Sequence, residues 1–185
     1  MTVAAFQTTL EDFLKLPEEK PALEYFEGVI RQKMSPKTRH AALQGELVSR
    51  INAVSRQNRV ALALPELRTT YGGSSFVPDV AVYRWSRLPR DTNGALIDDV
   101  TTPPDIAIEI ASPGQSVNSL VKRCRWYVAH GVGMAILVDP DDRSVLAFLP
   151  DGTIREWAGA DEIDLGDTVP DPHLTVDELF ASLTA

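Results

Sequence analysis

Two carboxylates, Asp79 and Glu109, are of a residue type, and have neighbours in the sequence, that could support metal binding or catalysis. Glu109 stands inside the apolar run 106–110, and Asp79 follows Pro78 and precedes a second apolar run. A carboxylate among β-branched neighbours needs a hydrogen-bonding partner, a proton or a cation. If the two strands are adjacent, both carboxylates can converge on one divalent ion, and hard oxygen ligands suit Mg²⁺ or Mn²⁺.

Such a metal ion would lower the pKa of a bound water and neutralise negative charge that grows on a phosphate. A purely structural interpretation competes with this one. Each carboxylate could instead accept hydrogen bonds from backbone amides or from an arginine. The spacing of Asp79 and Glu109 in the chain does not decide between the two.

The elements that must position these acids can be read from the pattern of apolar residues. Strand-like runs cover 60–71, 76–83, 105–110 and 134–138, and amphipathic helices are expected over about 37–58 and 116–130. The step from strand 105–110 through a helix to strand 134–138 is a crossover, so these two strands should be parallel neighbours. The expected fold is therefore α/β (α+β), with a mixed sheet flanked by helices.

Further elements are expected on both sides of this core. The N-terminal part contains a short helix over 9–16 and a hairpin that turns at Glu27-Gly28, and residues 84–104 form a long loop. Strands at 144–149 and 153–157 turn around Asp151-Gly152, and a last helix covers about 176–183 with Thr175 as its cap. We expect a single domain, 1–185, with an N-terminal helix and hairpin (1–36), a core (37–140) and an acidic C-terminal extension (141–185).

Composition excludes several classes of protein. The chain has 185 residues, 44% of them hydrophobic and 24% charged, which are ordinary globular values. No run approaches the roughly 20 apolar residues of a membrane helix, so no membrane partner is expected. Cys124 is the only cysteine, which excludes an internal disulfide or a cysteine-based zinc cluster and favours the cytoplasm.

The net charge of -8 is unevenly distributed along the chain. Residues 151–185 hold nine acids and one base, whereas residues 31–59 hold seven bases and one acid, Glu46. The total charge argues against general nucleic-acid affinity, but the local distribution allows a basic face. A solvated helix face is the other explanation of these bases.

A series of short motifs along the chain resembles the motifs of a known protein family. They are 23–28 (LEYFEG), His40, 78–82 (PDVAV), 104–113 (PDIAIEIASP), Tyr127 followed by Gly131-Val132, and 138–140 (VDP). In this order they resemble the Uma-type restriction endonuclease domain family, formerly a domain of unknown function, in the PD-(D/E)XK nuclease superfamily. The resemblance spans roughly residues 10–180.

The resemblance implies a restriction-endonuclease-like α-β-β-β-α-β core with an N-terminal helix-hairpin and a C-terminal antiparallel extension. It also implies Mg²⁺-dependent hydrolysis of DNA phosphodiester bonds by an endonuclease. Asp79 and Glu109 would be the metal ligands, and the backbone carbonyl of Ile110 could supply a third oxygen. A homodimer is compatible with such a small nuclease, because two cuts need two sites.

The chain departs from the family at one catalytic position. The superfamily often has a lysine two residues after the acid, where this chain has Ala111, and in this family the lysine lies fourteen residues after the glutamate. That position is Arg123 here, next to Lys122, which points about 100° away around the helix. Arginine keeps the charge but is a poor proton donor or acceptor at neutral pH.

Three interpretations of this substitution stay open. Arg123 could act electrostatically while the metal activates water, or Lys122 could reach over. Alternatively, hydrolysis is weak or lost, and the chain is a nuclease-fold module that binds nucleic acid or a protein partner.

Some residues near these motifs have two interpretations each. His40 resembles a family histidine, but its place on an apolar stripe favours a buried structural role. Glu46 could contact the metal or form an i,i+4 pair with Arg50. Trp85 or Trp126 could stack on a base or close a subunit interface. Glu24 lies in the family's hairpin motif without an evident role.

Overall fold

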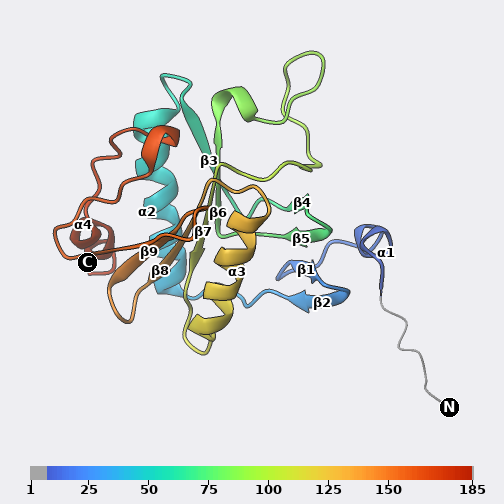
Figure 1. The fold of residues 1–185 in the computed structure, drawn as a ribbon, viewed down its shortest axis with the longest axis horizontal. Coiled ribbons are helices and arrows are strands. Elements are labelled where there is room, and N and C mark those ends of the chain that lie inside the picture. The colour runs from blue at the N-terminus through green and yellow to red at the C-terminus, as the bar shows by residue number, and fades with distance from the viewer. Residues whose placement is uncertain (1–7, 185) are drawn as a thin grey trace.

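The computed structural model describes residues 8–184 and forms a mixed α and β fold (Figure 1). Its first elements are a short helix and a hairpin, followed by a long helix: α1 (Leu10–Leu14), β1 (Leu23–Phe26), β2 (Val29–Gln32) and α2 (Thr38–Ser55). The predicted turn at Glu27-Gly28 is confirmed, and both of its residues have positive φ. No helix among residues 8–184 is both long and apolar enough to cross a membrane.

A six-stranded sheet forms the centre of the molecule. Its strands are β3 (Ala61–Pro65), β6 (Val80–Arg84), β7 (Ile106–Ile110), β8 (Met134–Asp139), β9 (Ser144–Phe148) and β10 (Ile154–Ala158). They lie in the order β10-β9-β8-β7-β6-β3, and only β7 and β8 run parallel. The predicted crossover is confirmed: helix α3 (Val117–Ala129) connects these two strands.

The two main helices cover opposite faces of this sheet (Figure 1). Side chains alternate between the faces of a strand, so neighbouring residues of β7 belong to different cores. Ile108 packs in the cluster of Leu43 and Ile51 from α2, whereas Ala107 packs in the cluster of Cys124 from α3. Glu109 follows the same alternation and points toward the α3 side.

The predicted mixed sheet is confirmed, and the structure adds a second sheet, because residues 60–76 contribute strands to both. β4 (Thr69–Tyr71) and β5 (Ser74–Phe76) form a hairpin around Gly72-Gly73 and join the N-terminal hairpin in a four-stranded antiparallel sheet, β2-β1-β5-β4. The chain leaves β3 through Glu66, which adopts φ +52°, before it starts β4. A turn with a left-handed residue other than glycine gives little signal in a sequence, and this one divides what looked like a single strand.

The remaining elements follow the prediction closely. The loop after β6 opens with a 3₁₀ turn (Trp85–Arg87), and Val100 further along pairs with Thr69. In the C-terminal part, β9 and β10 form the predicted antiparallel pair, and a second 3₁₀ turn (Gly166–Thr168) precedes α4 (Val176–Ala181). Thr175 caps α4 in a capping box with Glu178, and α4 packs against α2. The division into segments at residues 36 and 140 stays a prediction.

Candidate active site

The pairing of β6 with β7 brings Asp79 and Glu109 together. Val80 and Ile108 are the last pair of this ladder, Asp79 directly precedes Val80, and Glu109 directly follows Ile108. Both side chains are buried, and both line one small pocket of about 100 Å³.

Asp79 is surrounded by hydrogen-bond donors. Its Oδ1 lies 2.8 Å from Lys33 Nζ and 3.2 Å from His40 Nε2, and its Oδ2 accepts from the Ile110 amide at 2.7 Å. Burial by itself would raise the pKa of Asp79, but the bond from His40 and the charge of Lys33 outweigh burial and lower it. Asp79 is therefore held as an anion.

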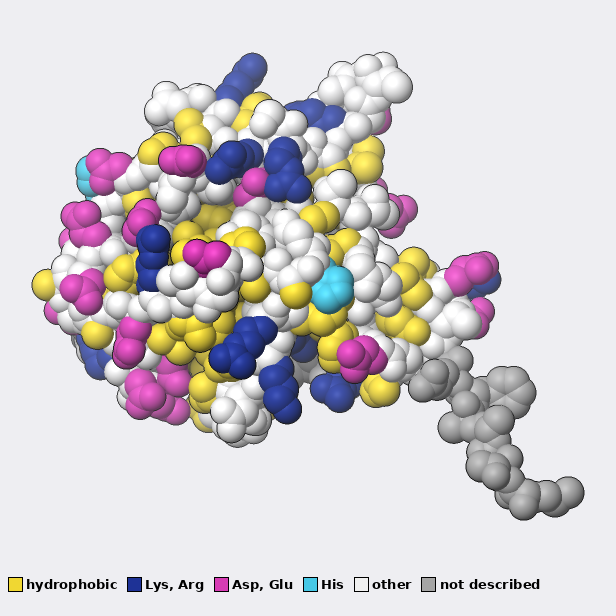
Figure 2. Space-filling model, in the orientation of Figure 1, with side chains coloured by type: hydrophobic (Ala, Val, Ile, Leu, Met, Phe, Trp, Pro, Cys, Tyr) yellow, Lys and Arg dark blue, Asp and Glu magenta, His cyan; other side chains and the backbone are white. Residues whose placement is uncertain are grey.

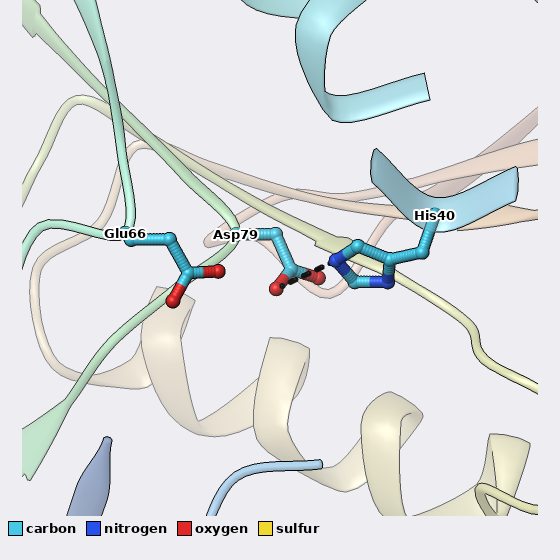
Figure 3. A group of neighbouring side chains, drawn as sticks. All are labelled: His40, Glu66 and Asp79. Carbon is cyan, nitrogen blue, oxygen red and sulfur yellow. Dashed lines mark ion pairs between the residues drawn. The ribbon is translucent and has the colours of Figure 1, made fainter. Parts of the chain in front are cut away.

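Figure 3 shows Asp79 between the other two members of a potential ligand group, His40 from α2 and Glu66 from the turn after β3. One ligand atom from each residue lies within 4.8 Å of the others. His40 is also fixed from its other side, where Nδ1 lies 3.0 Å from Ser112 Oγ. His40 is buried and hydrogen-bonded, which agrees with the structural interpretation. Its contact with Asp79 also makes it part of the site.

The surroundings of Glu109 stabilise its ionised form much less than those of Asp79 do. Its Oε1 accepts a hydrogen bond from the Tyr127 hydroxyl at 2.6 Å and a longer one from Arg123 at 3.4 Å. Among residues 8–184, no group donates a hydrogen bond to Oε2. Burial raises the pKa of Glu109 to about 7, and the nearby charge of Asp79 adds to this effect although Arg123 opposes it. The negative charge of ionised Glu109 is thus only partly compensated by its neighbours, and a bound cation could compensate the rest.

The raised pKa of Glu109 makes the stability of the metal-free protein depend on pH. Between about pH 4.5 and 7 the folded state binds a proton that the unfolded state has released, so stability falls as the pH rises through this window. We expect wild type to lose about 3 kcal/mol relative to Glu109→Gln across that window, since one pKa unit corresponds to about 1.4 kcal/mol. Urea denaturation in EDTA at a series of pH values measures the difference between the two proteins. Parallel pH curves would contradict the prediction.

Arg123 connects Glu24 to Glu109. Its guanidinium donates to both oxygens of Glu24, at 3.1 and 2.6 Å, and lies 5.1 Å above the ring of Phe76. Burial lowers the pKa of Arg123, but the charges of Glu109 and Glu24 outweigh burial and raise it. This contact gives Glu24 its role: it is buried, accepts from the Val77 amide, and holds the arginine in place.

The sequence analysis missed two residues of the site, Glu66 and Lys33, and Lys33 is the one that pairs with Asp79. It follows β2, its side chain is 11% exposed, and its Nζ also donates to Glu66 at 3.2 Å and to the Val77 carbonyl at 2.8 Å. Burial lowers the pKa of Lys33, but the charges of Asp79 and Glu109 outweigh it and raise the pKa, so the side chain is an ammonium. Its only sequence signal was membership in the basic stretch 31–59, because the contact with Asp79 spans 46 residues.

The remaining predicted residues lie at different distances from the two acids. Lys122 is exposed and lines a neighbouring, larger pocket, not the pocket of Asp79 and Glu109. Ile110 contributes its amide to Asp79, and the role of its carbonyl as a metal ligand stays a prediction. Glu46 pairs with Arg50 at 2.8 Å, the simpler of the two interpretations.

The donor set of this pocket fits a hard divalent cation. It offers carboxylate oxygens from Asp79 and Glu109, including an Oε2 that accepts no hydrogen bond within residues 8–184. The His40–Glu66–Asp79 group offers a second arrangement, but the ammonium of Lys33 lies within 3.2 Å of both its acids. A cation bound there would have to displace Lys33. Lys33 contacts Asp79 in either arrangement, but Glu109 also offers Oε2, which accepts no hydrogen bond within residues 8–184, so the side of Glu109 suits a metal ion better.

Comparisons with known proteins agree with this fold. A solved structure described as "Crystal structure of a putative nuclease belonging to DUF820 from Anabaena variabilis ATCC 29413" is 41% identical to the chain. The similarity covers 95% of this chain and 98% of that one, with a TM-score of 0.90. No curated protein matches the chain.

A family model matches residues 10–177, nearly the whole described chain, and its description is "Uma2: Putative restriction endonuclease". The matched region contains Asp79, Glu109, Arg123 and Lys33. Both comparisons support a nuclease. On this match the chain belongs to the Uma2 family.

Proposed function

We propose that the protein is a divalent-metal-dependent endonuclease that hydrolyses phosphodiester bonds in DNA, with Mg²⁺ or Mn²⁺ held by Asp79 and Glu109. One observation supports the proposal most strongly. Two buried carboxylates, one directly before β6 and one in β7, line one pocket, and burial raises the pKa of the second, Glu109, to about 7. A carboxylate in that state gains stability from a neighbouring cation.

The metal ion would supply an activated water and neutralise charge on the phosphate. The chain's own residues would orient the reaction around it. Asp79 stays ionised through its contacts with His40 and Lys33, and the Tyr127 hydroxyl fixes one oxygen of Glu109. That hydrogen bond leaves Oε2 of Glu109 as the oxygen for the cation.

Two of the cationic side chains that line the same pocket, Lys33 and Arg123, are placed to meet the charge of a phosphate. A bound metal ion would neutralise part of the negative charge of Asp79. The ammonium of Lys33 could then bind a phosphate oxygen or the attacking water. Both terminal nitrogens of Arg123 donate hydrogen bonds to Glu24, so the guanidinium contributes a positive charge at a fixed position. In this arrangement Lys33, and not Lys122, does the work of the family's lysine.

A second candidate is a nuclease-fold module that binds DNA without cutting it. The bidentate contact of Arg123 with Glu24 favours this candidate, because an arginine engaged in this way is poorly free to move toward a substrate. A homodimer, which would bring two sites to one duplex, is a further element of the proposal.

Cleavage of plasmid DNA and of an end-labelled duplex tests both candidates. The nuclease proposal predicts nicked or linear product with Mg²⁺ or Mn²⁺, and no product in EDTA. The same assay with Arg123→Lys restores the family's residue, and cutting by this variant beside an inactive wild type would favour the binding module. If wild type and an Asp79→Ala/Glu109→Ala double variant cut equally, the nuclease proposal is wrong.

A further inference from the structure

A second pocket, of about 390 Å³, adjoins the pocket of the two acids. Four residues line both pockets: Glu24, Arg31, Gln115 and Arg123. The larger pocket is lined by the N-terminal hairpin, by β5 and by the part of α3 from Ser119 to Trp126. Its volume is within the range of about 300 to 1,000 Å³ that small-molecule sites occupy.

Three aromatic rings that contact one another form the apolar wall of this pocket. The ring centroids of Phe26 and Phe76 are 5.5 Å apart, and the Trp126 ring lies 5.9 Å from Phe26 and 5.0 Å from Phe76. Phe26 and Trp126 are each partly exposed, so the wall is accessible from solvent. Aromatic side chains of this kind accept any nucleobase, because every base has a flat π face.

Positively charged side chains border the same wall. Arg31 and Lys122 are exposed and line the pocket, and neither pairs with a carboxylate of the described residues. Glu24 is already bound to Arg123, which leaves Glu27 as the one lining acid outside an ion pair in residues 8–184. Figure 2 shows Lys and Arg side chains over the lower half of α3 and beside it toward the hairpin. The charge that is free to meet a ligand is therefore positive.

We propose that this pocket binds an unpaired nucleobase of the DNA strand whose phosphate lies at Asp79 and Glu109. A base inside a duplex is covered by its neighbours on both faces, so only a base that has left the stack can reach the aromatic wall. Arg31 and Lys122 bind the adjoining phosphates, and the amide of Gln115 lies where the two pockets meet. The inference rests on the proposed function, and it defines the substrate class as DNA with a single-stranded segment, such as a flap, a bubble or a free end.

Binding without metal tests this pocket separately from cleavage. Fluorescence anisotropy in EDTA compares a labelled single strand with the duplex of the same sequence. We expect the single strand to bind more tightly, and Phe26→Ala to weaken its binding about tenfold, since stacking on an aromatic side chain contributes about 1–3 kcal/mol per base. Phe26→Tyr keeps the ring and should recover most of the binding that Phe26→Ala loses. Val29→Ala, at an exposed position of the same hairpin outside the pocket, is the control for folding.

A matched pair of charge variants separates the pocket from general electrostatics. Lys122→Gln and Arg125→Gln each remove one exposed positive charge from α3, but only Lys122 lines the pocket. We expect Lys122→Gln to weaken single-strand binding several times more than Arg125→Gln does. Equal weakening by both, with unchanged affinity of Phe26→Ala, would overturn the proposal.

Crosslinking locates the base on the wild-type protein and needs no variant that could misfold. A single strand with one 5-iodouracil is irradiated on the protein, and the linked peptide is identified by mass spectrometry. Linkage to Phe26 or Trp126 supports the pocket, and linkage only to other parts of the chain overturns it. Binding that depends on Phe26 without any cleavage would refute the nuclease proposal and support the pocket. Cleavage of blunt duplex with no effect of Phe26→Ala would support the nuclease proposal and refute the pocket.

Discussion

Replacing Asp79 with asparagine is expected to lower the rate of DNA cleavage by about 10³-fold. The change removes a charge that the fold keeps ionised against burial, and with it one of two ligands that would hold the metal ion. Metal-ion stabilisation of a developing charge contributes several kcal/mol, and each 1.4 kcal/mol corresponds to about a factor of ten in rate. Initial rates on end-labelled DNA at saturating Mg²⁺ measure the loss, and urea denaturation in EDTA shows whether the variant folds.

Two further variants decide which acids hold the metal. If Asp79 and Glu109 form the site, Glu109→Gln should lose about as much activity as Asp79→Asn, and Glu66→Gln should lose much less. If instead the His40–Glu66–Asp79 group holds the ion, this order is reversed. Calorimetric titration with Mn²⁺ gives a second measurement that does not depend on cleavage. The reversed order would contradict the site that we propose.

Replacing Lys33 with methionine is expected to destabilise the metal-free protein by about 3 kcal/mol. The ammonium is the closest positive charge to the buried carboxylate of Asp79, at 2.8 Å, and removal of one partner of a buried pair leaves the other uncompensated. Mg²⁺ should restore part of this stability, because a ligand that binds only the folded state stabilises it. Urea denaturation with and without Mg²⁺ measures both effects.

The same variant tests whether Lys33 also acts in catalysis. We expect Lys33→Met at saturating Mg²⁺ to cleave DNA about 10²-fold more slowly than wild type, which is the usual effect of removing one preorganised donor. Lys33→Arg keeps the charge and should recover part of the rate. Should Lys33→Met cleave at the wild-type rate once Mg²⁺ has restored its stability, the lysine is a counterion of Asp79 only, and its catalytic role is wrong.

The sequence by itself determined the elements that carry the two acids. The apolar run 106–110 followed by an amphipathic helix and a second apolar run specified the parallel pair of β7 and β8. Local patterns of this kind depend on side-chain periodicity and on short turns, both of which act within a few residues. The setting of Glu109 among β-branched residues likewise indicated an acid with an unusual environment, and burial does raise its pKa.

Only the tertiary structure decided what surrounds the acids. Lys33 reaches Asp79 across 46 residues of chain, and Glu24 reaches Arg123 across 99. Both contacts exist because the N-terminal hairpin joins β5 in a second sheet, and that sheet depends on the turn that separates β3 from β4. Strand pairing between distant segments is set by the packing of whole faces, so no local pattern records which lysine or glutamate will meet a given carboxylate.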